Sequence, residues 1–295
     1  MGRVLTYAFV VAAVLAPAGA ASHGALHGKI VYSIGYETAD NGEFGFRLMI
    51  VNPDGSGRKQ LTSGHTSDVN PAWSPDGTKI AFGRGNSDSD IGEDIWTIGS
   101  DGKDPANLTN GSGGDEPAWS PDGATIVYAH KLRQIWQMNA DGSNPRLLSK
   151  PPKKMSDSQP WFSHDGQTIL FVREDQSQQR ARWSIWQMNA DGTHAHRITA
   201  NARIVWDARP SPGGRKIAFA RSTIHVVNAD GSGDFDTKVA SDFASLAWAP
   251  DGSVVACACS GGLQIVDPLK RKETMLVRFP ARGLRDPEGV DWSSR

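Results

Sequence analysis

Short apolar runs and turn residues alternate along the whole chain. Runs such as Ile80-Ala81-Phe82 and Ile169-Leu170-Phe171 are apolar at consecutive positions, which indicates strands buried on both faces. A turn with Asp-Gly precedes each of these runs, as in SPDG (74–77) and SHDG (163–166). Asp-Gly between two apolar runs favours a tight hairpin, because glycine accepts a positive φ without steric conflict. The pattern predicts many short antiparallel strands.

Two motifs alternate and recur. The first, PAWSPDGTKIAF (71–82), returns at 117–128, 160–171, 208–219 and 246–257, and begins again at 289–294. The second is clearest as IWQMNADGSNPRLL (135–148) and as IWQMNADGTHAHRIT (185–199). Together they predict units of four strands whose first strand ends at one position, called here the Trp position: Trp73, Trp119, Phe162, Pro210, Trp248 and Trp292. A repeat of this period is typical of a β-propeller, in which each sheet packs between two neighbours.

The two ends of the repeat array are complementary. The last repeat stops after its first strand, whereas Lys29-Ile30-Val31-Tyr32 reads as a second strand without a first. Pairing strand 289–292 with strand 29–32 would close a ring and leave no exposed edge between the ends. We therefore predict an all-β fold: a six-bladed β-propeller of four-stranded antiparallel blades over residues 29–295.

The paired motifs resemble those of a known family. The combination of xxWSPDGxxIAF with IWxMNADGSxxxxLT is similar to the TolB-type propeller repeat over essentially all of 29–295. Related repeats occur in the propellers of prolyl oligopeptidase-like peptidases. The resemblance implies the fold, export from the cytoplasm and the binding of other molecules on one face. Fold by itself does not determine function.

The first 20 residues predict a secretory signal peptide. Arg3 is followed by an apolar stretch, and Ala18-Gly19-Ala20 matches a cleavage site. We expect a short tail at 21–28, a periplasmic or secreted mature protein without a membrane span, and a monomer. The formal net charge of −1 provides no electrostatic basis for binding nucleic acid.

The only cysteines are Cys257 and Cys259. Their spacing places both side chains on one face of a strand and does not favour a disulfide, for which the Cβ atoms must approach to about 4 Å. We interpret them as small buried hydrophobic residues.

One set of charged positions recurs. A base follows the second strand in four repeats, and an acid lies three to five residues before the Trp position in the same four. The bases are Arg84, His130, Arg173 and Arg221, and the acids are Asp68, Asp115, Asp157 and Asp207. One interpretation is an ion pair within each blade, with Asp68–Arg84 and Asp207–Arg221 as examples. The alternative is a ring of carboxylates around the channel that binds a cation or a basic group of a partner.

The long, dissimilar loops lie on one predicted face. They are 33–46, 84–94, 149–159, 173–184 and 279–289, whereas the opposite face carries near-identical SPDG and NADGS turns. Loops on a rigid scaffold are the usual carriers of function. Besides the recurring charged positions, the candidate binding residues are Glu116, Lys153, Lys154 and Trp206; Trp206 is either an aromatic anchor or packs locally.

The acidic segment 86–94 is a candidate cation site. Asp88, Asp90 and Asp94 alternate as the oxygen ligands of calcium could, although a solvated loop is the competing interpretation. Calcium could also lie in the central channel; otherwise we expect no cofactor. The NxDG or SDG turns at Asp54, Asp101, Asp141, Asp191 and Asp230 are expected to cap themselves rather than bind calcium.

No catalytic residue is assigned, and no G-x-S-x-G nucleophile motif is present. We predict an exported, non-catalytic scaffold that binds an envelope or secreted protein or peptide. The alternative is a carbohydrate-active propeller, either a polysaccharide binder or a metal-dependent lyase. A cluster of histidines at one channel mouth would favour the lyase.

Overall fold

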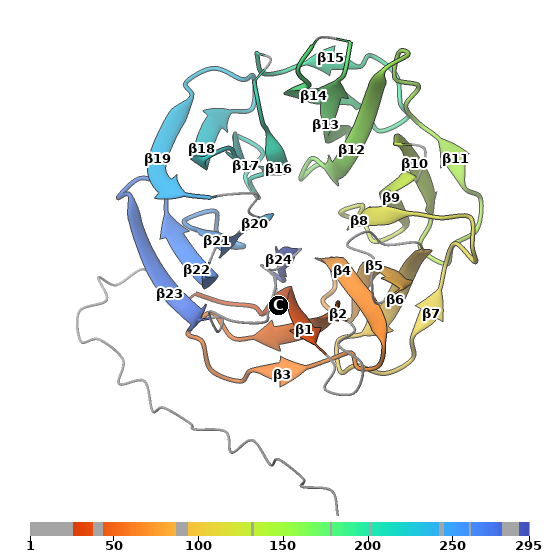
Figure 1. Ribbon diagram of the computed structural model, residues 1–295, viewed down its shortest axis with the longest axis vertical. Helices are drawn as coiled ribbons and strands as arrows, with labels where there is room; N and C mark the ends of the chain where they lie inside the picture. The colour runs from red at the N-terminus through yellow and green to blue at the C-terminus, as the bar shows by residue number, and fades with distance from the viewer. Residues whose placement is uncertain are drawn as a thin grey trace, which may run out of the picture.

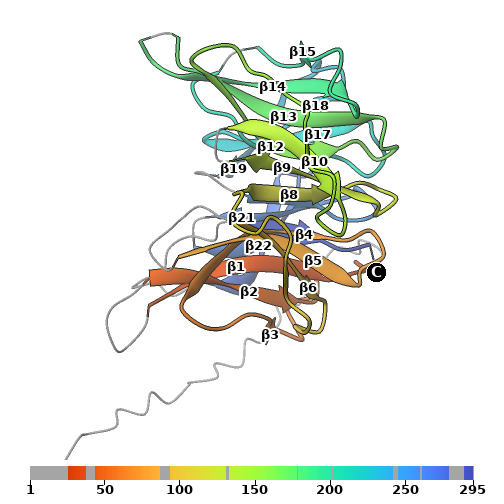
Figure 2. The same ribbon diagram turned by 90° about the vertical axis from the view of Figure 1, so that its right-hand side faces the viewer.

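The chain folds as a disc of blades around a central axis. The structure, a computed structural model, describes residues 26–37, 44–86, 94–130, 133–177, 179–200, 202–241, 245–259, 261–278 and 289–294. Within these residues the strands form six four-stranded antiparallel sheets arranged as a propeller (Figure 1). In the side view the strands run from one face of the disc to the other (Figure 2). The predicted six-bladed propeller is confirmed.

In each blade the first strand of the repeat lies nearest the axis and the fourth lies outermost. Blade one is β24 (Val290–Trp292), β1 (Ile30–Glu37), β2 (Phe44–Val51) and β3 (Lys59–Gln60). Blade two is β4 (Thr66–Trp73), β5 (Lys79–Asn86), β6 (Asp94–Gly99) and β7 (Ala106–Asn107). Blade three is β8 (Asp115–Trp119), β9 (Thr125–His130), β10 (Gln134–Asn139) and β11 (Arg146–Leu147). Blade four is β12 (Met155–Phe162), β13 (Thr168–Asp175), β14 (Arg182–Asn189) and β15 (His196–Arg197). Blade five is β16 (Trp206–Pro210), β17 (Lys216–Ala220), β18 (Thr223–Asn228) and β19 (Phe235–Ala240). Blade six is β20 (Ser245–Trp248), β21 (Val255–Cys259), β22 (Gly262–Asp267) and β23 (Lys272–Arg278).

The ring closes in blade one as predicted. Strand β24 pairs antiparallel with β1, and Ile30 lies opposite Trp292. Beyond the strand pair, the backbone N–H of Ser293 donates to the carbonyl of Lys29 at 2.8 Å. The N-terminal and C-terminal strands therefore belong to one sheet.

The core lies between the blades. Ile80, Ala81 and Phe82 of β5 are all fully buried. Ile80 and Phe82 pack against Val31 and Leu48 of blade one, whereas Ala81 points to the other side, into the cluster shared with blade three. Burial on both faces explains why the second strand of each repeat is continuously apolar rather than alternating.

The NxDG turns cap themselves. In the first, the N–H of Ser56 donates to Asp54 Oδ1 at 2.9 Å, and Gly55 takes a φ of +84°, where glycine is favoured. Hydrogen bonds from nearby side-chain and backbone donors lower the pKa of the turn aspartates Asp54, Asp101, Asp141, Asp191 and Asp230. This confirms their expected role as turn caps.

The interpretation of the cysteines was wrong. Cys257 and Cys259 form a disulfide within β21, with their Cα atoms 5.3 Å apart. That separation lies inside the range in which a disulfide can form. Two residues of an extended strand span about 6.6 Å, so the closer approach of the two Cα atoms in β21 is the feature that the spacing alone did not predict. Both residues are buried.

The predicted signal peptide (1–20) and most of the tail (21–28) lie outside the described residues. In the part of the chain that the structure describes, no helix is long and apolar enough to cross a membrane.

Candidate functional site

Acids five residues before the Trp position form buried ion pairs. Asp68 lies opposite Arg84 in the register of β4 and β5. The guanidinium donates to both carboxylate oxygens, at 2.6 and 2.9 Å, and lies 4.8 Å from the ring centre of Trp96. Asp68 is 1% exposed. The prediction of an ion pair within the blade is confirmed here.

Blade four repeats this arrangement. Arg173 donates to both oxygens of Asp157, at 2.6 and 2.8 Å, and stacks 4.3 Å from the ring centre of Trp186. Both members of the pair are buried. Bidentate pairs of this kind are geometrically specific, so these charges belong to the scaffold.

In blade five the predicted pair is wrong. Asp207 lies only three residues before the Trp position, and it pairs with Arg209 of its own strand at 2.5 Å rather than with Arg221. Val205 occupies the position five residues before, so no carboxylate there faces Arg221. The offset from the Trp position therefore decides whether an acid pairs within the blade.

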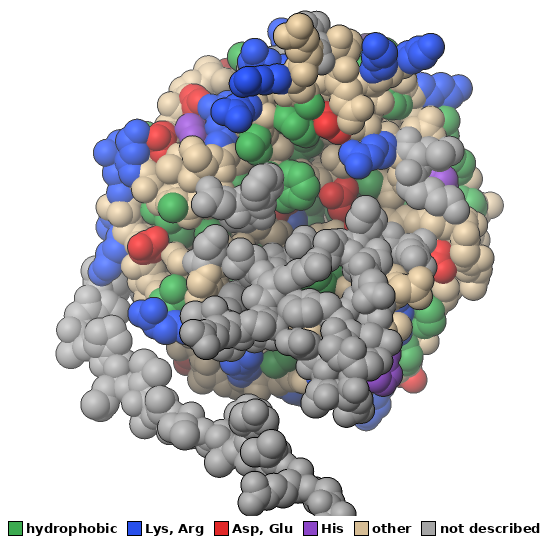
Figure 3. All heavy atoms as spheres, in the orientation of Figure 1, with side chains coloured by type: hydrophobic (Ala, Val, Ile, Leu, Met, Phe, Trp, Pro, Cys, Tyr) green, Lys and Arg blue, Asp and Glu red, His purple; other side chains and the backbone are tan. Residues whose placement is uncertain are grey.

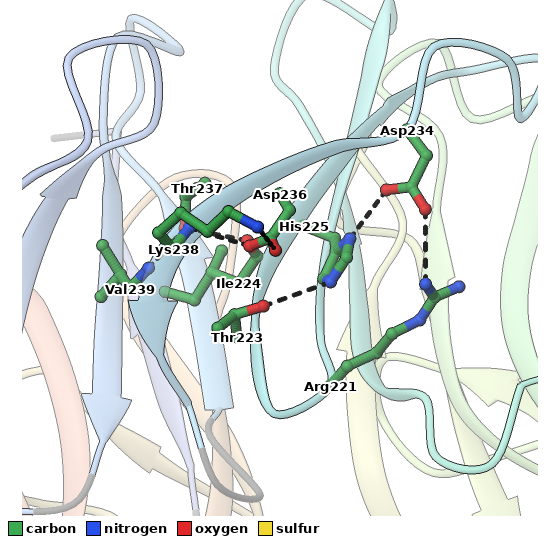
Figure 4. Close-up of polar contacts among 9 residues, drawn as sticks. All are labelled: Arg221, Thr223, Ile224, His225, Asp234, Asp236, Thr237, Lys238 and Val239. Atoms are coloured by element: carbon green, nitrogen blue, oxygen red, sulfur yellow. Dashed lines mark hydrogen bonds and ion pairs between the residues drawn. The ribbon is translucent and has the colours of Figure 1, made fainter.

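Arg221 instead turns outward to Asp234 in the loop between β18 and β19. Its Nη1 lies 3.3 Å from Asp234 Oδ2, and His225 Nδ1 lies 2.8 Å from the other oxygen (Figure 4). Thr223 Oγ1 lies 3.3 Å from His225 Nε2. This cluster lies on the outer strands of blade five, away from the axis.

In blade three the acid also lies at a different distance along the chain from the Trp position than in blades two and four. Gly114 lies five residues before the Trp position, and Asp115 takes the next place. Asp115 accepts a hydrogen bond from Asn70 Nδ2 at 3.0 Å. His130 Nε2 lies 2.9 Å from the carbonyl of Ser112, and its ring lies 5.2 Å from that of Trp136.

The innermost strands carry a bulge three residues before the Trp position. The register shifts there in β4, β8, β12 and β16, and the residue takes a positive φ of 44° to 54°. A bulge of this kind redirects a side chain. The residues at this position around the ring are Asn70, Glu116, Gln159, Asp207, Ser245 and Gly289.

Side chains near this bulge link each blade to the next. The acceptors include carboxylates, an amide and a hydroxyl, and most donors are backbone N–H groups of the following blade. In ring order, Trp73 N donates to Asp291, Asn70 Nδ2 to Asp115, Gln159 N to Glu116, Asp207 N to Gln159, Leu246 N to Asp207, and Val290 N to Ser245. The bonds connect all six blades around the axis; we call them the inner belt.

At the position one residue before the Trp position, three of the six blades carry a large or charged side chain. Ala72, Ala118 and Ala247 occupy this place in three blades, whereas Trp161, Arg209 and Asp291 occupy it in the others. The Arg209 guanidinium lies 3.7 Å from the ring centre of Trp161. Arg209 is 8% exposed, and its Nη1 has no hydrogen-bond partner.

Two carboxyl groups of the inner belt have strongly raised pKa values. Desolvation and the neighbouring Asp115 carboxylate raise the pKa of Glu116 to about 8. Desolvation raises the pKa of Asp291 to about 6, although Arg209 opposes the shift. Both side chains are partly exposed, and their strands, β8 and β24, are the innermost strands of their blades (Figure 1). At neutral pH Glu116 is mainly protonated and Asp291 mainly ionised.

Asp94 does not behave as a free cation ligand. Burial alone would raise its pKa, but bonds from Asn107, Thr109, Gly111 and Gly113 together lower it. The Thr109 hydroxyl donates to Asp94 Oδ1 at 2.7 Å. Asp94 thus ties the start of β6 to the segment that follows β7. Asp88 and Asp90 lie outside the described residues. Among the described residues, no group of three or more His, Cys, Asp or Glu is placed to hold a metal ion.

The remaining candidates lie on the loop face. Lys153 and Lys154 are exposed just before β12. Trp206 is half-buried at the start of β16 and packs against the cluster between blades five and six, which supports local packing. The aromatic partner of Arg209 is Trp161 rather than Trp206.

Four residues of this region were not predicted from the sequence: Asp291, Arg209, Gln159 and Asn70. A signal for them was present, since each departs from its neighbours in the repeat close to the Trp position. Aligning the repeats by offset from this position would have grouped them.

Comparisons with known proteins agree with this architecture. In structure, the chain is similar to TolB from Acinetobacter baumannii, with a TM-score of 0.70, 18% identity, and coverage of 92% of this chain and 67% of that one. It is also similar to an oligogalacturonate lyase in complex with manganese, with a TM-score of 0.55, 15% identity, and coverage of 87% and 75%. At these identities the likeness shows the fold alone.

In sequence, 54 residues are 41% identical to dipeptidyl-peptidase 5 of Porphyromonas endodontalis. That match covers 18% of this chain and only 8% of the peptidase, so it concerns the repeat and not the whole enzyme. Residues 20–269 match the family described as TolB beta propeller domain. The chain belongs to the TolB β-propeller domain family.

Proposed function

We propose that the protein is an exported, non-catalytic scaffold that binds an acidic segment of another protein or peptide on its loop face. One observation carries the proposal: a contiguous group of exposed basic side chains, called here the basic rim. It consists of Arg133, Lys153, Lys154, Arg180, Arg182 and Arg203.

Backbone contacts hold the parts of the rim together. Lys154 accepts a hydrogen bond from Gln176 at 2.9 Å, and Arg133 accepts one from Asp157 at 2.9 Å. Trp183, next to Arg182, pairs with Ala202. Loops from blades three, four and five therefore meet at one place. Figure 3 shows Lys and Arg side chains along the upper edge of this view, over the blade formed by β12–β15.

Few acids neutralise the rim. Arg133 pairs with Glu174 at 3.3 Å, and Asp175 caps the following turn. In the described part of the chain, no ion pair involves Lys153, Lys154 or Arg182. Exposed charges of one sign steer an oppositely charged partner and set its orientation. This supports an acidic partner.

Affinity capture with charge reversal tests the proposal. The mature protein is used to capture partners from periplasmic extract and culture medium. The double variant Lys153→Glu/Lys154→Glu should reduce capture about tenfold, since reversing rim charges weakens steering and adds repulsion. Lys103→Glu, an exposed charge on a tight turn of the opposite face, should leave capture unchanged. Loss of capture with Lys103→Glu alone would place binding on the other face.

We also propose export to the periplasm or medium, supported by the N-terminal sequence and the family. Mass spectrometry of the exported protein should find residues 1–20 removed. Retention of Met1 would contradict it.

A further inference from the structure

A pocket lies between blades two and three on the turn face, the face that carries the SPDG and NADGS turns. Its volume is about 470 Å³, within the range of sites that bind small molecules. Three turns form its walls: the β4–β5 turn of blade two, and the β8–β9 and β10–β11 turns of blade three. None of its lining residues belongs to the basic rim or to the inner belt. The pocket is therefore a separate candidate site.

Hydrogen bonds within the turns fix the walls of this pocket. Ser74 Oγ donates to Asp76 Oδ1 at 2.6 Å, and Ser120 Oγ donates to Asp122 Oδ1 at the same distance. The backbone N–H of Ala140 donates at 2.9 Å to a carbonyl of the β8–β9 turn, which ties the third turn to the second. Because the walls are ordered by the chain itself, a ligand need not order them on binding.

Part of the lining is apolar. Trp119 lies in the hydrophobic cluster between blades two and three and is 8% exposed. Its Nε1 donates to the carbonyl of Ala72 in blade two at 3.2 Å, which fixes the orientation of the ring. Pro75 and Pro121 add apolar surface from the two SPDG turns. The C–H groups of a ligand can pack against this surface.

Two polar groups of the lining remain available to a ligand. Asp122 uses Oδ1 for the Ser120 hydroxyl and for the N–H of Ala124, whereas its Oδ2 accepts no hydrogen bond from another of the described residues. Bonds from Ser120 and Ala124 lower the pKa of Asp122, so this carboxyl group is ionised at neutral pH. Lys79 is exposed, and its Nζ forms no ion pair or hydrogen bond within the described part of the chain. The pocket thus offers an acceptor and a donor beside its apolar surface.

The backbone of the turns offers little to a peptide. The N–H groups of Ser120 and Gly123 donate within the β8–β9 turn, and Pro121 has no N–H. The β4–β5 turn has the same internal bonds. Recognition of a peptide by strand addition requires a row of free main-chain groups. The available groups are therefore side chains, which favours a small molecule with hydroxyl groups.

We infer that this pocket binds a neutral pyranose ring, either as a free sugar or as one unit of a glycan. The C–H face of the ring packs against Trp119 and the two prolines. A hydroxyl group both donates and accepts, so ring hydroxyls can donate to Asp122 Oδ2 and accept from Lys79 Nζ. The lining carries two carboxylates, Asp76 and Asp122, against one ammonium, so repulsion disfavours a uronic acid. The inference goes beyond the proposed function, because it concerns the opposite face of the disc.

Ligand-observed NMR with defined sugars tests the inference. The methyl glycosides of glucose, galactose and mannose, together with cellobiose, galacturonate and hexaproline, are titrated into the mature protein at pH 7. At least one methyl glycoside should bind with a dissociation constant of about 1 mM, and galacturonate should bind at least about fivefold more weakly. Tighter binding of cellobiose than of methyl glucoside would indicate a glycan, and equal or weaker binding a single sugar.

Variants link binding to the pocket. Asp122→Asn keeps the oxygen that caps the turn but replaces the available acceptor by a donor, so it should weaken binding about tenfold. Asp165→Asn is the matched control, because Asp165 caps the equivalent turn of blade four through Ser163 at 2.6 Å and does not line the pocket. It should bind as the wild type does. Trp119→Phe should also weaken binding while remaining folded, since blade four carries Phe162 at the Trp position.

Three results would overturn the inference. They are no binding of any methyl glycoside up to about 10 mM, equal affinity in Asp122→Asn, Asp165→Asn and the wild type, or binding of hexaproline in place of the sugars, which would assign the pocket to a proline-rich peptide. None of these experiments involves Lys153 or Lys154, so capture by the basic rim can succeed while this site fails.

Discussion

Replacing Asp291 by asparagine should stabilise the propeller at neutral and alkaline pH. The folded protein holds the proton of Asp291 more tightly than the unfolded chain, because the pKa rises from 3.8 to about 6. Its contribution to stability is therefore fully present below about pH 4 and is lost as the pH rises through 6. Asparagine has no such loss and keeps an oxygen for the N–H of Trp73.

The expected gain in the free energy of unfolding follows from the pKa difference between the folded and unfolded states. A rise from 3.8 to about 6 corresponds to about 3 kcal/mol above pH 7, and the partial exposure of the side chain to solvent reduces this to about 1–3 kcal/mol. The free energy of unfolding is measured by urea denaturation, followed by tryptophan fluorescence, at pH 4, 6 and 8. The variant should match the wild type at pH 4 and exceed it at pH 8.

A matched control, Asp230→Asn, should change the stability in the opposite direction. Asp230 caps an exposed turn, and its pKa is lowered by bonds from Ser232. Asp230→Asn should reduce stability at pH 7 and have no effect at low pH. If Asp291→Asn destabilises the protein more at pH 8 than at pH 4, the ionised carboxylate is favourable in the folded protein, and the reasoning about the inner belt is refuted.

Three further predictions concern the scaffold. A double-mutant cycle at Asp157 and Arg173 should show a coupling above the ~0–1 kcal/mol of exposed pairs; Asp207 should couple to Arg209 and not to Arg221, and coupling to Arg221 would contradict the structure. Intact mass spectrometry after denaturation and alkylation should find no labelled cysteine until reductant is added, and two afterwards; two labels without reductant would exclude the disulfide. Deleting residues 286–295 removes β24 and its pairing with β1, so it should lower the melting temperature of the whole ring, and an unchanged melting temperature would argue against closure.

The fold could be predicted from the sequence because the turn residues and the apolar runs recur at matching positions in every repeat. The Asp-Gly turns and the continuously apolar second strands recur in step, and the two half-blades at the ends complete each other. The buried pairs Asp68–Arg84 and Asp157–Arg173 were also predictable, since both acids lie at the same offset from the Trp position.

The inner belt could not be predicted from spacing alone. At a bulge, Glu116 and Asp207 accept backbone N–H groups of the next blade, and the pairing of Asp207 with Arg209 depends on that local backbone. The raised pKa of Glu116 depends on Asp207 and Arg209 from another blade as well as on Asp115. Such contacts appear only when the ring has closed.

Hydrogen–deuterium exchange of the mature protein, with and without its captured partner, tests the proposed binding face most directly. We expect slower exchange in segments 153–157 and 176–184 when the partner is bound, and unchanged exchange in the turns at 100–103 and 141–144. Protection of those turns with no change at 153–157 and 176–184 would contradict it.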